Sequence, residues 1–232
     1  MTIAIILSGG TGVRLGGNIP KQYIEVNGRP IIADCIETFE KHPLVDKYVI
    51  VAAKEWEEYI LQVLDGLKVT KADIGKFSGF ASPGENRQLS IYSGLKLIEE
   101  FTADDDIVIV HDAARPFVTE ETITNLIKAC ESADGAMPAL PVKDTMYVQE
   151  NGRVKSLIDR DSLIAGQAPE AFLYRKYIAA NEALLPEKIL SIKGSTEPAF
   201  QAGMDIAVIE GDENNFKITT KEDLDRYMNC ID

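Results

Sequence analysis

The chain is poor in the residues that build disulfide frameworks and metal centres. Its 232 residues include three cysteines and two histidines. Cys35, Cys130 and Cys230 form no CxxC pair, so neither a disulfide framework nor a zinc site is expected. Because His42 and His111 are the whole histidine complement, a histidine metal cluster is excluded as well. A reducing compartment is the simplest setting for such a sequence.

Positive charge and long apolar runs are also scarce. The sequence has 24 Lys and Arg against 37 Asp and Glu, and a formal net charge of −13. Such an acidic surface repels nucleic-acid backbones and anionic membranes, so we expect neither as a partner. The run Ile3–Leu7 follows no basic residues and is too short for a signal peptide or a membrane span. We therefore expect a cytoplasmic protein that binds phosphate through a few placed cations.

Short apolar runs alternate with amphipathic segments over the first 141 residues. Apolar residues make up 45% of the chain, as in ordinary globular domains. The segments that read as buried strands are Ile3–Leu7, Tyr48–Ala52, Lys76–Phe80, Ile107–Val110 and Ala136–Pro141. The segments that read as helices are Pro30–Glu40, Glu55–Leu67, Leu89–Phe101 and a helix capped by Thr119 that ends near Cys130. This alternation predicts an α/β fold whose mostly parallel central sheet has helices on both faces and binds ligands at the carboxyl ends of its strands.

The alternation breaks after Pro141. The runs Thr145–Gln149 and Val154–Ile158 flank Asn151-Gly152, a hairpin signal, and predict a β-arm at about 142–162 that projects from the sheet. The chain then returns to a helix at 172–185, a strand at 206–209 and a helix at 220–228. Because the sequence shows no internal repeat and no linker, we expect residues 1–232 to form one domain from which the β-arm projects.

A glycine-rich loop follows the first predicted strand. It comprises Ser8, Gly9, Gly10, Thr11 and Gly12, and is followed by the cations Arg14 and Lys21. Glycines at the carboxyl end of a buried strand let backbone N–H groups surround an anion, which favours phosphate binding over a plain turn with two surface cations. No Walker A sequence is present. Leu15 stands where a dinucleotide fingerprint needs glycine, and the second strand lacks a following acid, which disfavours a nicotinamide oxidoreductase.

Further polar residues follow other predicted strands. Gly84, Glu85, Arg87 and Ser90 lie in a polar loop that runs into a helix, and alone they read as an ordinary helix start. Asp112, directly after a buried strand, suits a magnesium ion or a substrate hydroxyl, although it could merely pair with Arg115. Thr145, Arg160, Thr196 and Lys217 read from spacing alone as surface, ion-pair, helix-cap and strand-end residues.

Taken in order, these motifs resemble the IspD/TarI family of cytidylyltransferases, which join CTP to a polyol phosphate and release pyrophosphate. The resemblance runs from Ile3 to about Tyr227. Its specific parts are Gly-Gly-x-Gly-x-Arg with Pro-Lys-Gln at 9–22, Arg87 with Ser90, His111–Pro116, Asp144-Thr145, Asp159-Arg160 and Asn215-x-Lys217-x-Thr219.

The resemblance implies a Rossmann-like nucleotidyltransferase fold and a role for each matched residue. The loop Ser8–Gly12, Arg14 and Lys21 would hold the CTP phosphates, the stretch Gly84–Ser90 would read cytosine, and Lys217 would lie at the α-phosphate. The residues implied at the polyol phosphate are Asp112, Arg115, Thr145, Arg160 and Thr196. Asp112 is also the candidate ligand for Mg²⁺ or another divalent cation. The arm would cross to a partner subunit in a homodimer, placing Thr145 and Arg160 in the partner's site.

The chain departs from the family pattern at several positions. Ser-Gly-Gly at 8–10 replaces Ala-Ala-Gly or Ala-Gly-Gly, Glu85 replaces an aspartate, Gln-Ala-Pro-Glu at 167–170 replaces Gln-Thr-Pro-Gln, and Thr196-Glu197 replaces Thr-Asp. His-Asp-Ala-Ala-Arg-Pro at 111–116 favours 2-C-methyl-D-erythritol 4-phosphate as the substrate, with D-ribitol 5-phosphate as the alternative. A non-catalytic nucleotide-binding module is the alternative of another class, and the retained Lys21 and Lys217 argue against it.

Overall fold

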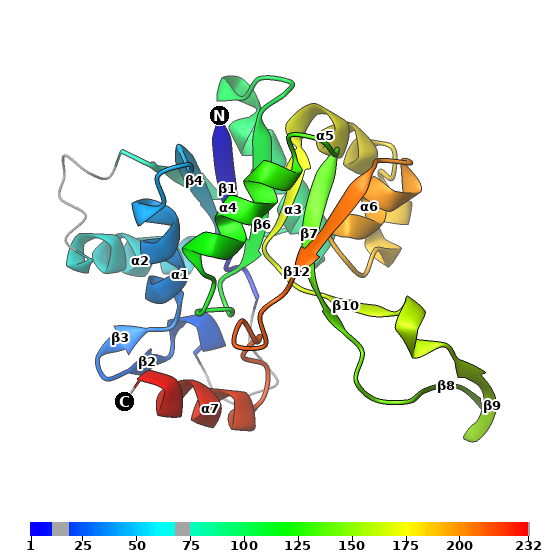
Figure 1. The fold of residues 1–232 in the computed structure, drawn as a ribbon. Coiled ribbons are helices and arrows are strands. Elements are labelled where there is room, and N and C mark those ends of the chain that lie inside the picture. Colours follow the sequence, from blue (N-terminus) through cyan, green and yellow to red (C-terminus); the bar gives the residue numbers. More distant parts are fainter. Residues whose placement is uncertain (11–18, 68–74, 232) are drawn as a thin grey trace.

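In the computed structural model, residues 1–10, 19–67 and 75–231 are described, and they form a central sheet between two layers of helices (Figure 1). The eight strands run in the order β10-β7-β11-β6-β1-β4-β5, and β12 pairs with β7. Their bounds are β1 Thr2–Leu7, β4 Lys47–Val51, β5 Phe77–Ala81, β6 Ile107–Asp112, β7 Gly135–Pro141, β10 Ile164–Gly166, β11 Glu170–Leu173 and β12 Ile206–Glu210. The pairs β5-β4, β4-β1, β1-β6 and β7-β12 are parallel.

Strand β1 shows why both faces of the sheet need helices. Side chains alternate between faces along a strand, and Ala4 and Ile6 belong to one apolar cluster while Ile3 and Ile5 belong to another. The first cluster is covered by α1 (Ile32–Lys41), α2 (Lys54–Gly66) and α4 (Glu120–Ala129). The second is covered by α3 (Arg87–Ile98), α5 (Tyr174–Glu182) and α6 (Thr196–Gln201). The predicted α/β class, with a mostly parallel sheet and helices on both faces, is therefore confirmed.

The prediction of a helix over 172–185 is wrong in its first part. Residues Glu170–Leu173 form β11, which lies antiparallel between β6 and β7, and the helix begins only at Tyr174. A second short strand, β10, also pairs antiparallel with β7. A short apolar run such as Ala171-Phe172-Leu173 has no periodicity that distinguishes a buried strand from the start of a helix.

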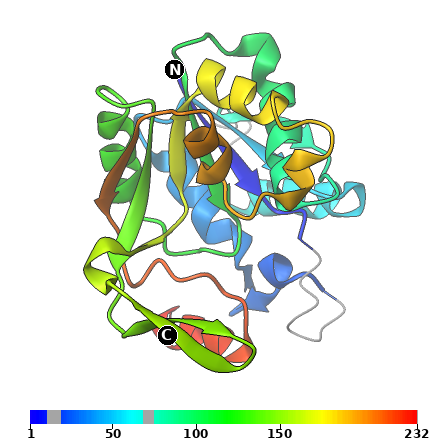
Figure 2. The same cartoon turned by 90° about the vertical axis from the view of Figure 1, so that its right-hand side faces the viewer.

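The β-arm extends beyond the edge of the sheet, as Figures 1 and 2 show. Strands β8 (Met146–Glu150) and β9 (Arg153–Ile158) pair only with each other. Asn151 and Gly152, the predicted hairpin signal, have φ values of 51° and 75°, and two positive φ values are what a type I′ turn requires. Apolar side chains of the arm face solvent: Tyr147 is 55% exposed and Leu157 is 65% exposed.

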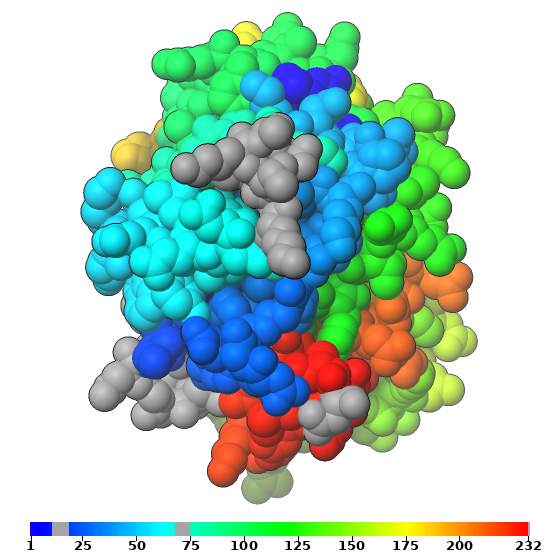
Figure 3. Space-filling view, turned by 90° about the vertical axis from the view of Figure 1, so that its left-hand side faces the viewer, coloured from blue at the N-terminus to red at the C-terminus, as the bar shows by residue number. Residues whose placement is uncertain are grey.

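The C-terminal helix α7 (Lys221–Ile231) lies beneath the small hairpin of β2 (Glu25–Val26) and β3 (Arg29–Pro30) in Figure 1. In the space-filling view of Figure 3, the red C-terminal residues lie below the blue N-terminal ones at the same end of the molecule. Short 3-10 helices lie at Lys21–Tyr23, Glu99–Phe101, Arg160–Ser162 and Lys188–Ser191. A third apolar cluster, centred on Ile31, Ile218 and Tyr227, joins α7 to the body. This packing holds the segment before α7, residues 214–219, against the carboxyl end of the sheet.

Candidate active site

A cleft of about 700 Å³ opens at the carboxyl ends of the parallel strands. It is lined by Leu7, Gly9, Gly10, Lys21, Gln22, Gly84, Glu85, Asn86, Arg87, Ser90, Asp112, Ala114, Lys217 and Thr219. Nine of the residues predicted for the site are among them, drawn from four segments far apart in the sequence. Among the described residues that line the cleft, the three cations of Lys21, Arg87 and Lys217 outnumber the two carboxylates of Glu85 and Asp112, so this lining is cationic in an acidic protein.

One glycine allows the first loop to touch the 83–90 loop, and another allows the 83–90 loop to fold against the helix that follows it. A Cβ on Gly9 would lie 2.5 Å from Cβ of Pro83, and one on Gly84 would lie 2.3 Å from Cβ of Leu89. Both distances are shorter than any real contact between carbon atoms. Within the described residues, a Cβ on Gly10 would meet nothing within 4 Å, so none of them prevents close approach of a ligand to the backbone there.

The start of the glycine loop is fixed by side chains behind it. Nε2 of Gln22 donates to the carbonyl oxygens of Ser8 (2.6 Å) and Gly10 (2.9 Å). The Ser8 hydroxyl donates to the Tyr23 hydroxyl at 2.8 Å, and the Tyr23 ring stacks on Trp56. The rest of the predicted loop, namely Thr11, Gly12 and Arg14, lies outside the described residues.

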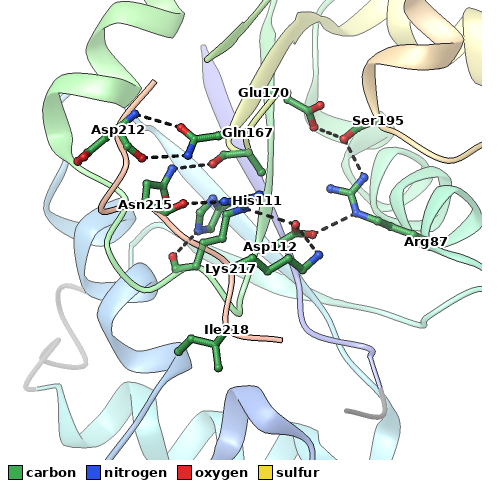
Figure 4. Close-up of polar contacts among 12 residues, drawn as sticks. Arg87, His111, Asp112, Gln167, Glu170, Ser195, Asp212, Asn215, Lys217 and Ile218 are labelled. Atoms are coloured by element: carbon green, nitrogen blue, oxygen red, sulfur yellow. Dashed lines mark hydrogen bonds and ion pairs between the residues drawn. The ribbon is translucent and has the colours of Figure 1, made fainter. Parts of the chain in front are cut away.

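Asp112 is the centre of the charged groups in the cleft (Figure 4). Its Oδ1 accepts from Nε of Arg87 at 3.1 Å and its Oδ2 from Nζ of Lys217 at 2.8 Å, while Nε of Arg115 lies 3.9 Å from Oδ2. Burial alone would raise the pKa of this carboxyl, but the three cations lower it well below its usual range. Asp112 is therefore an anion that holds three cations together.

The segment 214–219 is tied to the sheet through its backbone. Nζ of Lys21 donates to the carbonyl oxygen of Ile218 at 2.5 Å, and Nη1 of Arg115 donates to that of Asn215 at 2.6 Å. These two bonds flank Lys217 in the chain. The side chains predicted at the triphosphate and at the polyol phosphate thus position the residue predicted at the α-phosphate.

His111 shapes the turn and does not serve as a base. Its ring is fully buried, and Nε2 lies 3.0 Å from the carbonyl oxygen of Arg115. Burial lowers its pKa to about 4, against the opposing influence of Asp112. The ring is therefore neutral at physiological pH and accessible to no substrate.

A second carboxylate, that of the half-buried Glu170, lies behind Arg87, and it is not among the site residues predicted from the sequence. Thr196 Oγ1 donates to Glu170 Oε1 at 3.0 Å, and the Ser195 hydroxyl donates to Oε2. Ser195 in turn accepts from Nη1 of Arg87 at 2.7 Å. The substitution of Glu for the family's usual Gln at 170 was the one signal that pointed to it.

The structure separates the two arm residues from this cleft. Thr145 and Arg160 are exposed, and neither lines the cleft of its own chain. Nη1 of Arg160 donates to the carbonyl oxygen of Lys143 at 2.8 Å, and its Nε lies 3.9 Å from Oδ1 of Asp161. Arg160 is thus held by the arm itself.

The described part of the chain contains no cluster of three or more His, Cys, Asp and Glu side chains that would bind a metal on its own. The same residues include no helix with the length and apolarity needed to cross a membrane.

The comparisons with known proteins agree over nearly the whole chain. Residues 2–229 match the family model of IspD, 2-C-methyl-D-erythritol 4-phosphate cytidylyltransferase. The 2-C-methyl-D-erythritol 4-phosphate cytidylyltransferase of Geobacter metallireducens is 35% identical over 225 residues, covering 95% of this chain and 93% of that protein. A ribitol-5-phosphate cytidylyltransferase of Streptococcus agalactiae serotype III is 29% identical over 230 residues, covering 98% and 93%.

A solved structure supports the same relationship. The 4-diphosphocytidyl-2C-methyl-D-erythritol synthase of Anaerococcus prevotii superposes with a TM-score of 0.82 at 26% identity, covering 99% of this chain and 95% of that one. The sequence resemblance is therefore confirmed by a family model, by relatives and by the fold. This chain belongs to the IspD family of cytidylyltransferases.

Proposed function

We propose that this enzyme transfers CMP from CTP to 2-C-methyl-D-erythritol 4-phosphate and releases pyrophosphate. The observation that carries the proposal is the cleft in which Lys21, Arg87 and Lys217 converge beside a glycine loop. The family model and the Geobacter relative favour this polyol phosphate. D-ribitol 5-phosphate is the alternative, because the streptococcal relative matches 98% of the chain.

The chemistry that this cleft supports is electrostatic. The attacking group is a phosphate monoester, whose second pKa of about 6 leaves it largely dianionic at neutral pH, so no general base is needed. A reaction without a general base agrees with a buried His111 that is neutral and out of reach of the substrate. The barrier lies in bringing one anion to another, and Lys21 and Lys217, with Arg14, would stabilise the charge that builds up at the α-phosphorus.

We propose that the divalent cation, Mg²⁺ or a similar ion, arrives bound to the CTP phosphates. The donor set fits such a cation, because magnesium is commonly held by one or two carboxylates together with substrate phosphates. Asp112, one of the two carboxylates that line the cleft, would hold it. When bound, the ion would neutralise charge on the triphosphate. The other carboxylate of the described lining, Glu85, belongs to the loop that we propose reads cytosine.

We further propose a cytoplasmic homodimer in which each arm reaches the partner's cleft. The described cysteines, Cys35, Cys130 and Cys230, are all free, as suits a reducing compartment. An isolated two-stranded hairpin is marginally stable in water, and this one exposes apolar side chains that a partner surface would cover. Thr145 and Arg160 would then complete the polyol phosphate site of the other subunit.

A coupled pyrophosphate assay with CTP and each polyol phosphate in parallel tests the proposed function. We expect faster pyrophosphate release with 2-C-methyl-D-erythritol 4-phosphate than with D-ribitol 5-phosphate, and a preference for CTP over UTP. A higher kcat/KM with ribitol phosphate would select the alternative. CTP binding without pyrophosphate release from either compound would identify a non-catalytic module.

A further inference from the structure

Arg87 is held on two edges of its guanidinium group. Nε donates to Oδ1 of Asp112 at 3.1 Å, and Nη1 donates to Oγ of Ser195 at 2.7 Å. The side chain is 32% exposed and lines the cleft. Its orientation toward a ligand thus depends on Ser195 as much as on Asp112.

The hydroxyl of Ser195 has one proton, and its direction is fixed by its neighbours. Arg87 can only donate, so Ser195 accepts from Arg87 and must donate its own proton elsewhere. Oε2 of Glu170 receives it, and Thr196 donates to the other carboxylate oxygen. The two hydroxyls meet different carboxylate oxygens, so an amide in the same place would turn its NH₂ group, which can only donate, toward one of them. The carboxylate accepts both, as Figure 4 shows for Ser195.

We infer that Glu170 is a positioning residue that acts through the Ser195 hydroxyl to hold Arg87 toward the cleft. Glu170 touches no cleft surface itself, and Ser195 is fixed from behind by Tyr177, whose hydroxyl donates to the Ser195 carbonyl oxygen at 2.7 Å. The inference rests on the proposed cytidylyltransferase function, in which Arg87 belongs to the nucleotide end of the site.

This arrangement gives the enzyme a dependence on the ionisation of Glu170. The groups that face it are Arg87 from α3, Asp112 from β6, Arg115 from the following loop, Tyr177 from α5, and Ser195 and Thr196 at the start of α6. Burial raises the pKa of Glu170, and Arg87 and the two hydroxyls oppose that rise. Protonation on the acid side would remove an acceptor and leave Ser195 without a fixed proton direction.

The decisive variant is Glu170→Gln, which keeps shape and removes charge. We expect kcat/KM to fall about fivefold near neutral pH, the worth of one hydrogen bond. The ratio of wild type to variant should shrink toward one as the pH is lowered, because wild-type Glu170, whose pKa is raised by burial, becomes protonated. Glu210→Gln, the same change at an exposed carboxylate on β12, should leave kcat/KM unchanged at every pH.

A double-mutant cycle with Ser195→Ala tests the route of the effect. If Glu170 acts through Ser195, the double variant loses no more CTP affinity, measured by calorimetry, than Ser195→Ala alone. The inference would be overturned if the losses of CTP affinity in the two single variants multiply in the double variant. It would also be overturned if the ratio of kcat/KM between wild type and Glu170→Gln does not change with pH. Thermal melting should show all variants folded, and the conservative Ser195→Thr, which keeps a hydroxyl, should retain more CTP affinity than Ser195→Ala. An inactive wild type would refute the proposed function, whereas the calorimetric cycle would still decide the role of Glu170.

Discussion

The cleft and the arm hold their charged residues in different ways. We call the cluster of Asp112, Arg87 and Lys217 the floor of the cleft. In the floor, Asp112 is 11% exposed and bonded to Arg87 and Lys217, so each charge is fixed by another. On the arm, Arg160 has a side chain 52% exposed and bonds to a carbonyl oxygen of its own arm. A preorganised site needs groups fixed before the substrate arrives. The floor already meets that condition in one chain, and the arm would meet it only against a partner.

Among changes to the floor of the cleft, Lys217→Ala should have the largest effect on activity. We expect turnover to fall about 10²–10³-fold, the usual cost of losing one preorganised contact to transition-state charge, with a much smaller change in CTP affinity. Single-turnover kinetics and a CTP titration measure the two effects. Lys221→Ala, which removes an exposed lysine at the start of α7, is the matched control. An unchanged rate with lost CTP affinity would contradict the role of Lys217.

The buried His111, next to Asp112 in the chain, should also contribute to the loss of stability at acid pH. His111 has a folded pKa of about 4 and an unfolded pKa of about 6.5. As the pH falls below 6.5, the unfolded chain takes up a proton that the folded chain refuses until about pH 4, so stability is lost across this window. The loss attributable to His111 is about 3 kcal/mol.

The variant His111→Gln, which cannot titrate, isolates that loss. The difference in unfolding free energy between wild type and variant, from urea denaturation, should be constant above pH 6.5 and should change toward acid pH in favour of the variant. A difference that stays flat from pH 7 to pH 4 would show that His111 does not supply the dependence.

The arm is tested by Arg160→Ala. We expect KM for the polyol phosphate to rise about tenfold, because a charge-assisted bond to phosphate is lost, while CTP binding stays near normal. Arg153→Ala, also on the exposed arm, should leave KM unchanged. If both variants behave alike, general arm charge explains the effect and Arg160 has no special place.

Mixed dimers then decide which subunit the arm serves. At polyol phosphate concentrations well below KM, the Arg160→Ala homodimer and the Lys217→Ala homodimer should both have low activity. Co-refolded heterodimers should regain one intact site if the arm acts in trans, because one subunit supplies Lys217 and the other Arg160. No recovery would place the arm in its own subunit's site.

The smallest effect is expected at the edge of the floor, from Ser8→Ala. This change removes the hydroxyl that donates to Tyr23 but leaves the Gln22 bonds to the loop in place. We expect about 1 kcal/mol less stability in urea unfolding and a change in CTP KM of at most about threefold. A larger loss of CTP affinity would mean that this single hydroxyl bond, and not Gln22, positions the loop.

The sequence predicted the parallel part of the sheet and most of the cleft for one physical reason. The carboxyl ends of parallel strands meet at one edge, so Gly9, Arg87 and Asp112 could be brought together by counting strands. Glu170 escaped this reasoning because β11 runs antiparallel. It stands at the start of its strand and yet lies at the same edge, where a rule based on strand ends does not look. The dense pairing around Asp112 was likewise beyond reach, since spacing does not reveal which side chains touch.

Asp112 gives the cations of the cleft a counter-ion within the protein itself. Its carboxylate occupies the space between Arg87, Arg115 and Lys217 that a weakly charged solute would otherwise enter. A chloride ion or a monoanion exchanges one charge for one charge there and gains little, while it surrenders its hydration. A triphosphate brings several charges at once and can engage Lys217 and Lys21 together. We therefore expect the cleft to select ligands by charge density, and small anions such as chloride to compete poorly for it.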